Sequence, residues 1–173
     1  MSIPSRIFII GPMGSGKSTV GKRLAQMLGY RFIDSDQELE LRTGVDIPYI
    51  FDKEGEAGFR RRERQLLAEL TQEQNIVLAS GGGAVLDEQT RKHMKERGYV
   101  VYLHATVDEQ LNRTRHSQNR PLLQTPDRRT KLMQLMVERE PLYREIADCV
   151  IFTDTRFPKT VANQIKNKLQ MRP

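Results

Sequence analysis

The stretch from Gly11 to Ser18 constrains the fold of this chain more than any other; it reads G-P-M-G-S-G-K-S and is followed by Thr19. It matches the phosphate-binding loop pattern G-x-x-x-x-G-K-[ST], in which backbone N–H groups surround phosphate oxygens, the lysine contacts the terminal phosphates and the hydroxyl binds magnesium. An apolar run over 6–10 predicts a buried strand before the loop, and the apolar spacing over 18–28 predicts a helix after it. Because a helix N-terminus favours an anion, the sequence predicts a nucleotide phosphate site here.

Apolar runs and helical spacings also predict the fold class. Further strands are expected over 30–34, 76–79, 99–103 and 149–153. Helices are expected over 37–42, 59–70, 87–97, 107–114, 127–146 (broken or kinked at Pro141) and 158–171, with short helical turns over 43–58. Strands that alternate with helices predict a mainly parallel sheet covered on both faces, a three-layer α/β fold. The length of 173 residues suits one domain spanning 1–173.

Charge and composition exclude several classes of protein. The chain has 28 Lys and Arg against 22 Asp and Glu, but the basic residues are distributed and the aromatic residues form no stacking platform, so a nucleic-acid partner is not expected. An excess of cations suits a site for phosphates and an anionic substrate. We expect a soluble, cytoplasmic protein, because no signal peptide and no membrane-spanning apolar run are present. The single cysteine, Cys149, excludes an intrachain disulfide and is expected in the core.

Two carboxylates follow the second predicted strand. On an extended chain, Asp34 and Asp36 would point the same way, at the sheet edge where open α/β sheets bind ligands. We expect both to serve the ligand site. The alternative is that Asp36 caps the helix 37–42 and Asp34 forms a turn.

Three further segments carry the character of a ligand site. Arginines at 60–62 begin a predicted helix, where they oppose the helix dipole unless Glu63 or a bound anion lies close; two of the three are expected on a solvated face. Three glycines over 81–83 follow the third strand and leave room for close ligand approach. The polar segment 115–126 is a candidate mobile lid, with an ordinary connector as the alternative.

Other nucleotide-binding classes fit poorly. A GTPase needs an N-K-x-D motif late in the chain, which is missing, and the D-x-x-G spacing over 52–55 lacks its preceding apolar strand. A motor or remodelling ATPase needs a larger chain and an h-h-h-h-D-E strand end. Small-molecule phosphotransfer remains, with a gluconate or nucleotide kinase, or a non-catalytic ATP-binding regulatory module, as alternatives.

Six motifs in order resemble the shikimate kinase family over essentially the full length: G-P-M-G-S-G-K-S-T at 11–19, D-S-D at 34–36, G-F-R at 58–60, S-G-G-G-A-V at 80–85, R-P-L-L at 120–123 and E-R-x-P-L-Y at 138–143. The resemblance implies ATP-dependent phosphorylation of the 3-hydroxyl of shikimate, in the pathway to chorismate and the aromatic amino acids. It also implies a nucleoside-monophosphate-kinase-like fold with a five-stranded parallel sheet of order 2-3-1-4-5. A substrate-binding region at about 35–62, a lid at about 113–126 and a monomer are implied as well.

The resemblance implies a role for individual residues. Shikimate contacts are implied for Asp36, Arg60, Gly82 and Arg139, and catalytic roles for Lys17, Asp36 and Arg120. ATP contacts are implied for Gly14, Ser15, Gly16, Lys17, Ser18, Thr19, Arg113, Arg120 and Arg156. One Mg²⁺ ion, carried with ATP, is implied at Ser18 and Asp34, with Ser80 as a further candidate. Phe51 and Phe59 resemble an aromatic wall of the substrate pocket, and Glu63 resembles an acid that pairs with an arginine there.

Overall fold

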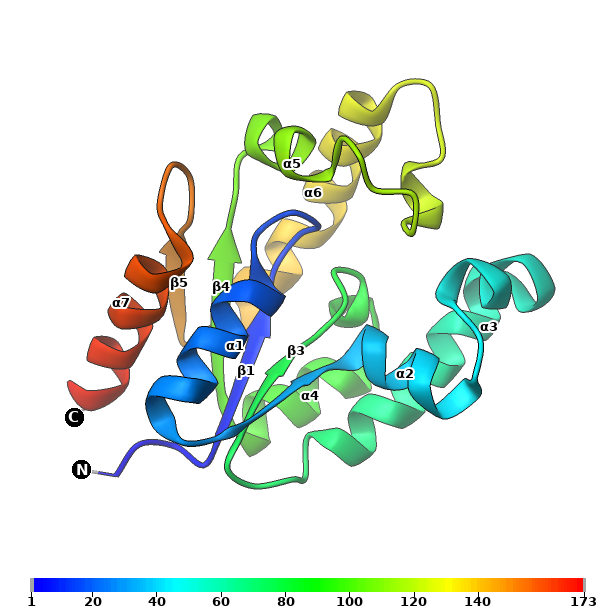
Figure 1. The fold of residues 1–173 in the computed structure, drawn as a ribbon. Helices are drawn as coiled ribbons and strands as arrows, with labels where there is room; N and C mark the ends of the chain where they lie inside the picture. The colour runs from blue at the N-terminus through cyan, green and yellow to red at the C-terminus, as the bar shows by residue number, and fades with distance from the viewer. Residues whose placement is uncertain (1, 173) are drawn as a thin grey trace.

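A parallel sheet lies between two layers of helices in the computed structural model, which describes residues 2–172 (Figure 1). Its strands are β1 (Arg6–Ile10), β2 (Arg31–Asp34), β3 (Ile76–Ala79), β4 (Tyr99–His104) and β5 (Cys149–Phe152). The five strands have the order β2-β3-β1-β4-β5, and all neighbouring pairs are parallel. The predicted α/β class and strand order are confirmed.

Helices connect the strands and cover both faces of the sheet. They are α1 (Lys17–Leu28), α2 (Ser35–Thr43), α3 (Ile47–Leu70), α4 (Glu88–Arg97), α5 (Val107–Thr114), α6 (Arg128–Ile146) and α7 (Pro158–Gln170), with short 3₁₀ helices η1 (Ala84–Leu86) and η2 (Pro121–Leu123). Among the residues from 2 to 172, no helix is both long and apolar enough to cross a membrane.

The side chains of β1 show how the two layers are separated. Ile7 and Ile9 belong to the core under α1 and α7, whereas Phe8 and Ile10 belong to the core under α2, α3, α4 and α6. Successive side chains of a strand point to opposite faces, so a strand covered on both faces must be apolar throughout. The continuous apolar runs of the sequence therefore correspond to buried central strands. Cys149 is only partly buried, packing beside the α1 and α7 core.

The start of α2 differs from the prediction. The helix begins at Ser35, and Asp34 is its N-cap: one carboxylate oxygen accepts the N–H groups of Asp36 and Gln37 at 2.9 and 3.2 Å. The predicted extended conformation over Asp34 and Asp36 is wrong, and so is the alternative of a cap at Asp36. Asp34 is itself the N-cap, so the helix begins at Ser35, earlier than predicted. Asp36 lies in the first helical turn.

Two other predicted boundaries also differ. Helix α3 covers Ile47–Leu70 where the sequence indicated short turns before 59, and Gly55, at φ 70° and ψ 179°, is the kink inside it. Such a φ is accessible to glycine without a steric cost. Helix α6 continues through Pro141 and is not broken there. Pro141 has no N–H group to donate to the carbonyl oxygen of Val137. Val137 is 80% exposed, so water can donate a hydrogen bond to this carbonyl instead.

Candidate functional site

Three glycines shape the phosphate-binding loop between β1 and α1. Gly11, Gly14 and Gly16 have φ values of 149°, 75° and 89°, which side-chain-bearing residues rarely adopt. A Cβ on Gly11 would lie 2.4 Å from the carbonyl oxygen of Leu103, so the loop packs directly on the end of β4. The loop thus places backbone N–H groups and the N-terminus of α1 around one space, as the motif predicts.

Lys17 closes on its own loop. Its Nζ donates hydrogen bonds to the carbonyl oxygens of Gly11 and Pro12, both at 2.8 Å. Burial, together with the nearby positive charge of Arg120, lowers the pKa of Lys17 to about 7. A buried ammonium group in this position favours an incoming anion, which would restore its full charge.

Ser18 and Asp34 form an oxygen-rich corner beside Lys17. The Ser18 hydroxyl donates to Asp34 Oδ2, while Asp34 Oδ1 is used in capping α2. The Ser80 hydroxyl, at the end of β3, is buried without a partner. In the described part of the chain no three His, Cys, Asp or Glu side chains cluster as a metal cage. This donor set fits Mg²⁺, which is usually bound by one or two carboxylates together with substrate phosphates.

A polar cavity of about 560 Å³ opens above the phosphate loop. This cavity is lined by most of the residues that were predicted to bind the nucleotide or the metal: Gly14, Gly16, Lys17, Ser18, Thr19, Asp34, Arg113 and Arg120. The side chain of Ser15 is instead buried under the loop. Arg156 is exposed and donates to Gln164 at 2.6 Å, outside this cavity. The structure therefore brings together every predicted nucleotide residue except these two side chains.

Arg113 ties the phosphate loop to the end of β5. Its guanidinium donates to the carbonyl oxygen of Gly14 at 3.0 Å, and to the hydroxyl and carbonyl oxygens of Thr153 at 3.1 and 2.9 Å. A further bond joins Arg113 to Glu109 at 2.8 Å. These bonds hold the Arg113 side chain at the edge of the polar cavity. They also stabilise the phosphate loop through the carbonyl of Gly14.

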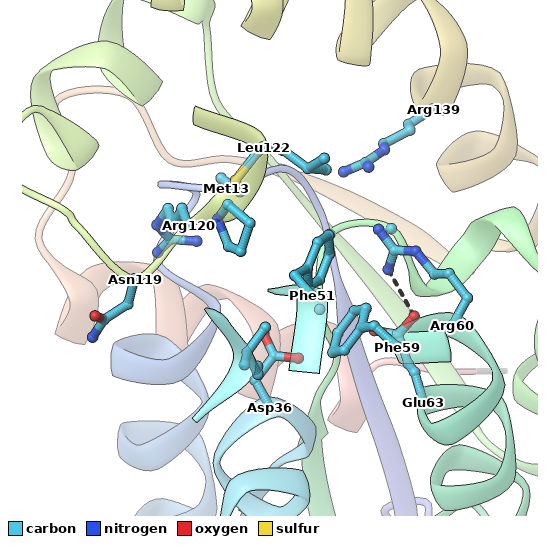
Figure 2. Close-up of a pocket in the computed structure, with 15 residues that line it drawn as sticks. Met13, Asp36, Phe51, Phe59, Arg60, Glu63, Asn119, Arg120, Leu122 and Arg139 are labelled. Carbon is cyan, nitrogen blue, oxygen red and sulfur yellow. Dashed lines mark hydrogen bonds and ion pairs between the residues drawn. The ribbon is translucent and has the colours of Figure 1, made fainter. Parts of the chain in front are cut away.

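A second cavity adjoins the first (Figure 2). All four residues predicted to contact the acceptor line it: Asp36, Arg60, Gly82 and Arg139. Asp36, Arg120 and Asn119 line both cavities, so the two spaces meet at these side chains.

An aromatic and ionic wall forms one side of this second cavity. The rings of Phe51 and Phe59 lie with centroids 5.0 Å apart, and both line the space. Arg60 donates to Glu63 at 2.8 Å, the contact drawn in Figure 2. Burial raises the pKa of Glu63, and its second oxygen has no partner. Arg61 and Arg62 are exposed, as expected for two of the three consecutive arginines.

Arg139 enters the cavity from α6 as a buried cation without an anion. Its residue is 3% exposed, its Nε has no hydrogen-bond partner, and it forms no ion pair with any described carboxylate. Transferring an unpaired charge out of water is costly, so such a group stabilises an anionic ligand strongly. Arg139 therefore indicates a carboxylate or phosphate in this cavity.

Asp36 lies at the junction of the cavities with a perturbed carboxyl group. Burial, together with the negative charges of Glu63 and Asp34, raises the pKa of Asp36 to about 7. A carboxylate whose pKa is near the working pH is suited to accept a proton from a hydroxyl group.

The segment predicted as a lid covers both cavities. Asn119, Arg120, Pro121 and Leu122 line the acceptor cavity, and Arg120 Nε is buried without a partner. The segment is anchored by Leu123, which is 2% exposed and packs with Met13, Leu132 and Leu135.

Sequence reasoning missed several residues of the site. Asn119 and Met13 line the acceptor cavity, Ile47 lines both cavities, and Thr153 holds Arg113. Asn119 lies beside the R-P-L-L motif and Met13 lies inside the phosphate-loop motif, so both could have been found there, but no local pattern marks Ile47 or Thr153.

The phosphate loop at the end of β1 adjoins a cavity that contains a carboxyl group with a pKa of about 7 and arginines without an ion-pair partner among residues 2–172. This combination defines a P-loop phosphotransferase that acts on a small anionic acceptor. The model of the shikimate kinase family matches residues 13–170. The chain belongs to the shikimate kinase family.

Individual relatives agree with this assignment. A shikimate kinase from Shewanella oneidensis is 55% identical over 169 residues, covering 98% of this chain and 99% of the relative. One from Halorhodospira halophila is 55% identical over 170 residues, with coverage of 98% and 96%.

Solved structures agree as well. The shikimate kinase from Acinetobacter baumannii in complex with shikimate has a TM-score of 0.95 at 48% identity, covering 96% of this chain and 93% of that one. A gluconokinase from Sinorhizobium meliloti has a TM-score of 0.63 at 19% identity, covering 98% and 94%, which shows a shared fold alone.

Proposed function

We propose that this chain transfers the terminal phosphoryl group of ATP to the 3-hydroxyl of shikimate, giving shikimate 3-phosphate and ADP. The observation that carries the proposal is the junction of two cavities at Asp36 and Arg120: one cavity surrounds a phosphate loop, and the other contains the unpaired cation of Arg139. Shikimate has one carboxylate and three hydroxyls, which complement the arginines and the carboxylate of this cavity.

The acceptor is held through its carboxylate in this proposal. Arg60 and Arg139 grip the carboxylate with charge-assisted hydrogen bonds, which suits the planar guanidinium. Gly82 keeps the space beside Arg139 open for the acceptor, because a Cβ there would already lie in van der Waals contact with Arg139 Nη1, at 3.4 Å. Phe51 and Phe59 exclude water beside the ring of the acceptor.

Transfer then proceeds at the junction of the cavities. The 3-hydroxyl oxygen forms a bond to the γ-phosphorus, the bond from that phosphorus to the β,γ-bridging oxygen breaks, and the hydroxyl proton passes to Asp36. Lys17 and Arg120 stabilise the negative charge on the transferring group. Arg120 belongs to the lid, so it lies close to the transferring phosphoryl group when the lid covers the site. Phosphoryl transfer is therefore favoured when both substrates are enclosed.

Ser18 and Asp34 would hold one Mg²⁺ ion that arrives with ATP. When bound, the ion neutralises charge on the β- and γ-phosphates. The Asp34→Asn variant tests this role without removing the helix cap, since asparagine also caps helices. We expect turnover to fall by at least about tenfold and to need more Mg²⁺.

Initial rates against Mg²⁺ concentration measure that effect. Asp46→Asn, the equivalent change at the cap of α3, serves as control because Asp46 lies outside both cavities. Full activity of Asp34→Asn at low Mg²⁺ would refute the metal role.

We propose that the acceptor region at about 35–62 and the lid at about 113–126 belong to one domain, 1–173. A coupled ADP-release assay with shikimate, gluconate and nucleoside monophosphates tests the activity. Turnover is expected with shikimate alone. Turnover with gluconate or a monophosphate instead would favour another small kinase, and ATP binding without turnover would favour a regulatory module.

A further inference from the structure

Tyr143 on α6 is a buried side chain that lines neither substrate cavity and has no part in the chemistry above. It is fully buried, and its hydroxyl donates to the carbonyl oxygen of Gly82 at 2.5 Å. Burial raises the pKa of this hydroxyl above its usual range, so the group stays protonated and remains a donor around neutral pH. Tyr143 therefore holds the peptide that follows Gly82 in one orientation.

The orientation of this peptide determines where a free donor lies. In a trans peptide, the carbonyl of Gly82 and the N–H of Gly83 point to opposite sides. Both glycines line the acceptor cavity, whereas Tyr143 does not and instead lines a separate small cavity together with Pro12 and Met13. Within residues 2–172 no hydrogen-bond acceptor takes the N–H of Gly83. Because the carbonyl is hydrogen-bonded to Tyr143, outside the acceptor cavity, the N–H on the opposite side of the peptide faces the acceptor.

Helix α6 applies a second constraint to the same loop. Arg139 precedes Tyr143 by one helical turn, so both side chains lie on one face of α6. Arg139 Nη1 lies 3.4 Å from the position that a Cβ on Gly82 would occupy. One turn of α6 therefore places both the guanidinium of Arg139 and the hydroxyl of Tyr143 against Gly82.

We propose that Tyr143 is a positioning residue for the acceptor: its hydroxyl fixes the Gly82–Gly83 peptide so that the N–H of Gly83 is held ready to bind an oxygen of shikimate. The proposal rests on the proposed function, because it concerns the same acceptor cavity. Glycines have unusual backbone freedom, so without this anchor the peptide samples other orientations. Ordering it again on binding would reduce affinity.

Tyr102 offers a matched control for this hydroxyl. Its ring stacks on that of Tyr143 with centroids 5.0 Å apart, and it is also fully buried. Its hydroxyl donates to Glu140 at 2.5 Å, with no contact to the glycine loop. Tyr102→Phe therefore removes the same atom from the neighbouring ring and leaves the Gly82 peptide anchored.

The experiment compares wild type, Tyr143→Phe and Tyr102→Phe by steady-state kinetics and by calorimetry with shikimate. In Tyr143→Phe we expect the KM and Kd for shikimate to rise about tenfold, the equivalent of one buried hydrogen bond. The KM for ATP and kcat should stay within about twofold, and Tyr102→Phe should bind shikimate as the wild type does. Equal losses in both variants, or a loss in thermal stability alone, would overturn the proposal.

A measurement on the wild-type protein keeps the test independent of how the variants fold. The NMR resonance of the Gly83 amide should shift on titration with shikimate, and an unmoved resonance would overturn the proposal. A wild type that does not phosphorylate shikimate would refute the proposed function and the role of Tyr143 together. A wild type that does so while Tyr143→Phe behaves identically would refute the role of Tyr143 alone.

Discussion

Asp36 and Lys17 lie close enough at the junction of the two cavities for each to influence the charge of the other. Burial moves the pKa of both to about 7, from 3.8 for the carboxyl and 10.5 for the amine. Their charges are thus sensitive to small changes near neutral pH, which is typical of groups that handle protons or phosphates. The burial that shifts the pKa of Asp36 also lowers the stability of the folded protein at neutral pH.

Asp36→Asn should separate catalysis from stability. Between pH 4 and 7 the unfolded chain has lost the Asp36 proton that the folded chain retains, so the folded state loses stability as pH rises through this window and stays lower above it. Asparagine does not ionise. We expect the variant to have a higher Tm than wild type at pH 8, and the difference to vanish near pH 4.

Its turnover should fall by about 100-fold or more, because the proton acceptor is lost. Thermal unfolding across pH and initial rates measure the two effects. Asp52→Asn, on the exposed surface of α3, is the control and should change neither. A Tm difference that does not vary with pH would contradict the burial of an ionisable Asp36.

Arg139→Ala should remove shikimate binding without a large loss of stability. The guanidinium has no carboxylate partner among the described residues, so its removal breaks no ion pair. We expect the Kd for shikimate to rise by about 100-fold or more, as for loss of a buried charged contact. Calorimetry measures the Kd, with Arg129→Ala on the exposed face of α6 as control. Retained affinity would remove Arg139 from the carboxylate clamp.

Local motifs account for the residues that sequence reasoning found. Lys17 and Ser18 lie within one contiguous pattern, and Arg60 and Arg139 lie within short motifs of the resemblance. Thr153 and Ile47 were missed because their roles come from packing between elements far apart in the chain. A side chain that supports another leaves no local signal.

At the scale of elements, the boundaries of helices depend on atoms that periodicity does not describe. Helix α2 begins two residues before its predicted start because the Asp34 side chain satisfies its first N–H groups. Helix α3 extends through Gly55 because glycine permits a kink that joins two helical pieces. The existence of these elements was predictable from apolar spacing, whereas their ends required the capping geometry.

The Arg120→Ala variant tests whether the segment 115–126 acts as a lid. Arg120 lines both cavities, and its Nε lacks a partner, so the side chain is available to the transferring phosphoryl group. We expect kcat to fall by about 100-fold or more while the Kd for shikimate changes little. Stopped-flow or steady-state rates with calorimetry measure the two quantities.

Arg115→Ala is the control within the same segment, because Arg115 is exposed and outside both cavities. An unchanged kcat in Arg120→Ala would reduce the segment to a connector.

For the whole molecule, the parallel order of five strands brings the carboxyl ends of β1, β2 and β3 to one edge, where α1, α2 and the glycine loop begin (Figure 1). This convergence explains how motifs from 11–19, 34–36 and 80–85 meet. The alternation of strands and helices predicted the layers from the sequence. The two adjoining cavities could not be predicted in this way, because their shape depends on how the lid and α3 pack.

The proposed enzyme needs no second copy, since one chain supplies the residues of both cavities. We therefore expect a monomer. Sedimentation velocity should give a mass near 20.0 kDa, unchanged by ATP and shikimate. A dimer mass at micromolar concentration would contradict this expectation.

The two cavities share a wall that has a consequence for inhibition; it is formed by Asp36, Ile47, Gly81, Gly82, Asn119 and Arg120. A phosphate loop is common to many nucleotide-binding proteins, so a mimic of ATP alone has little selectivity. A bisubstrate compound that crosses this wall would gain the high effective concentration of a linked ligand, about 100-fold or more in affinity over either half. Competition calorimetry against the separate halves would measure the gain, and the selectivity would come from the acceptor half.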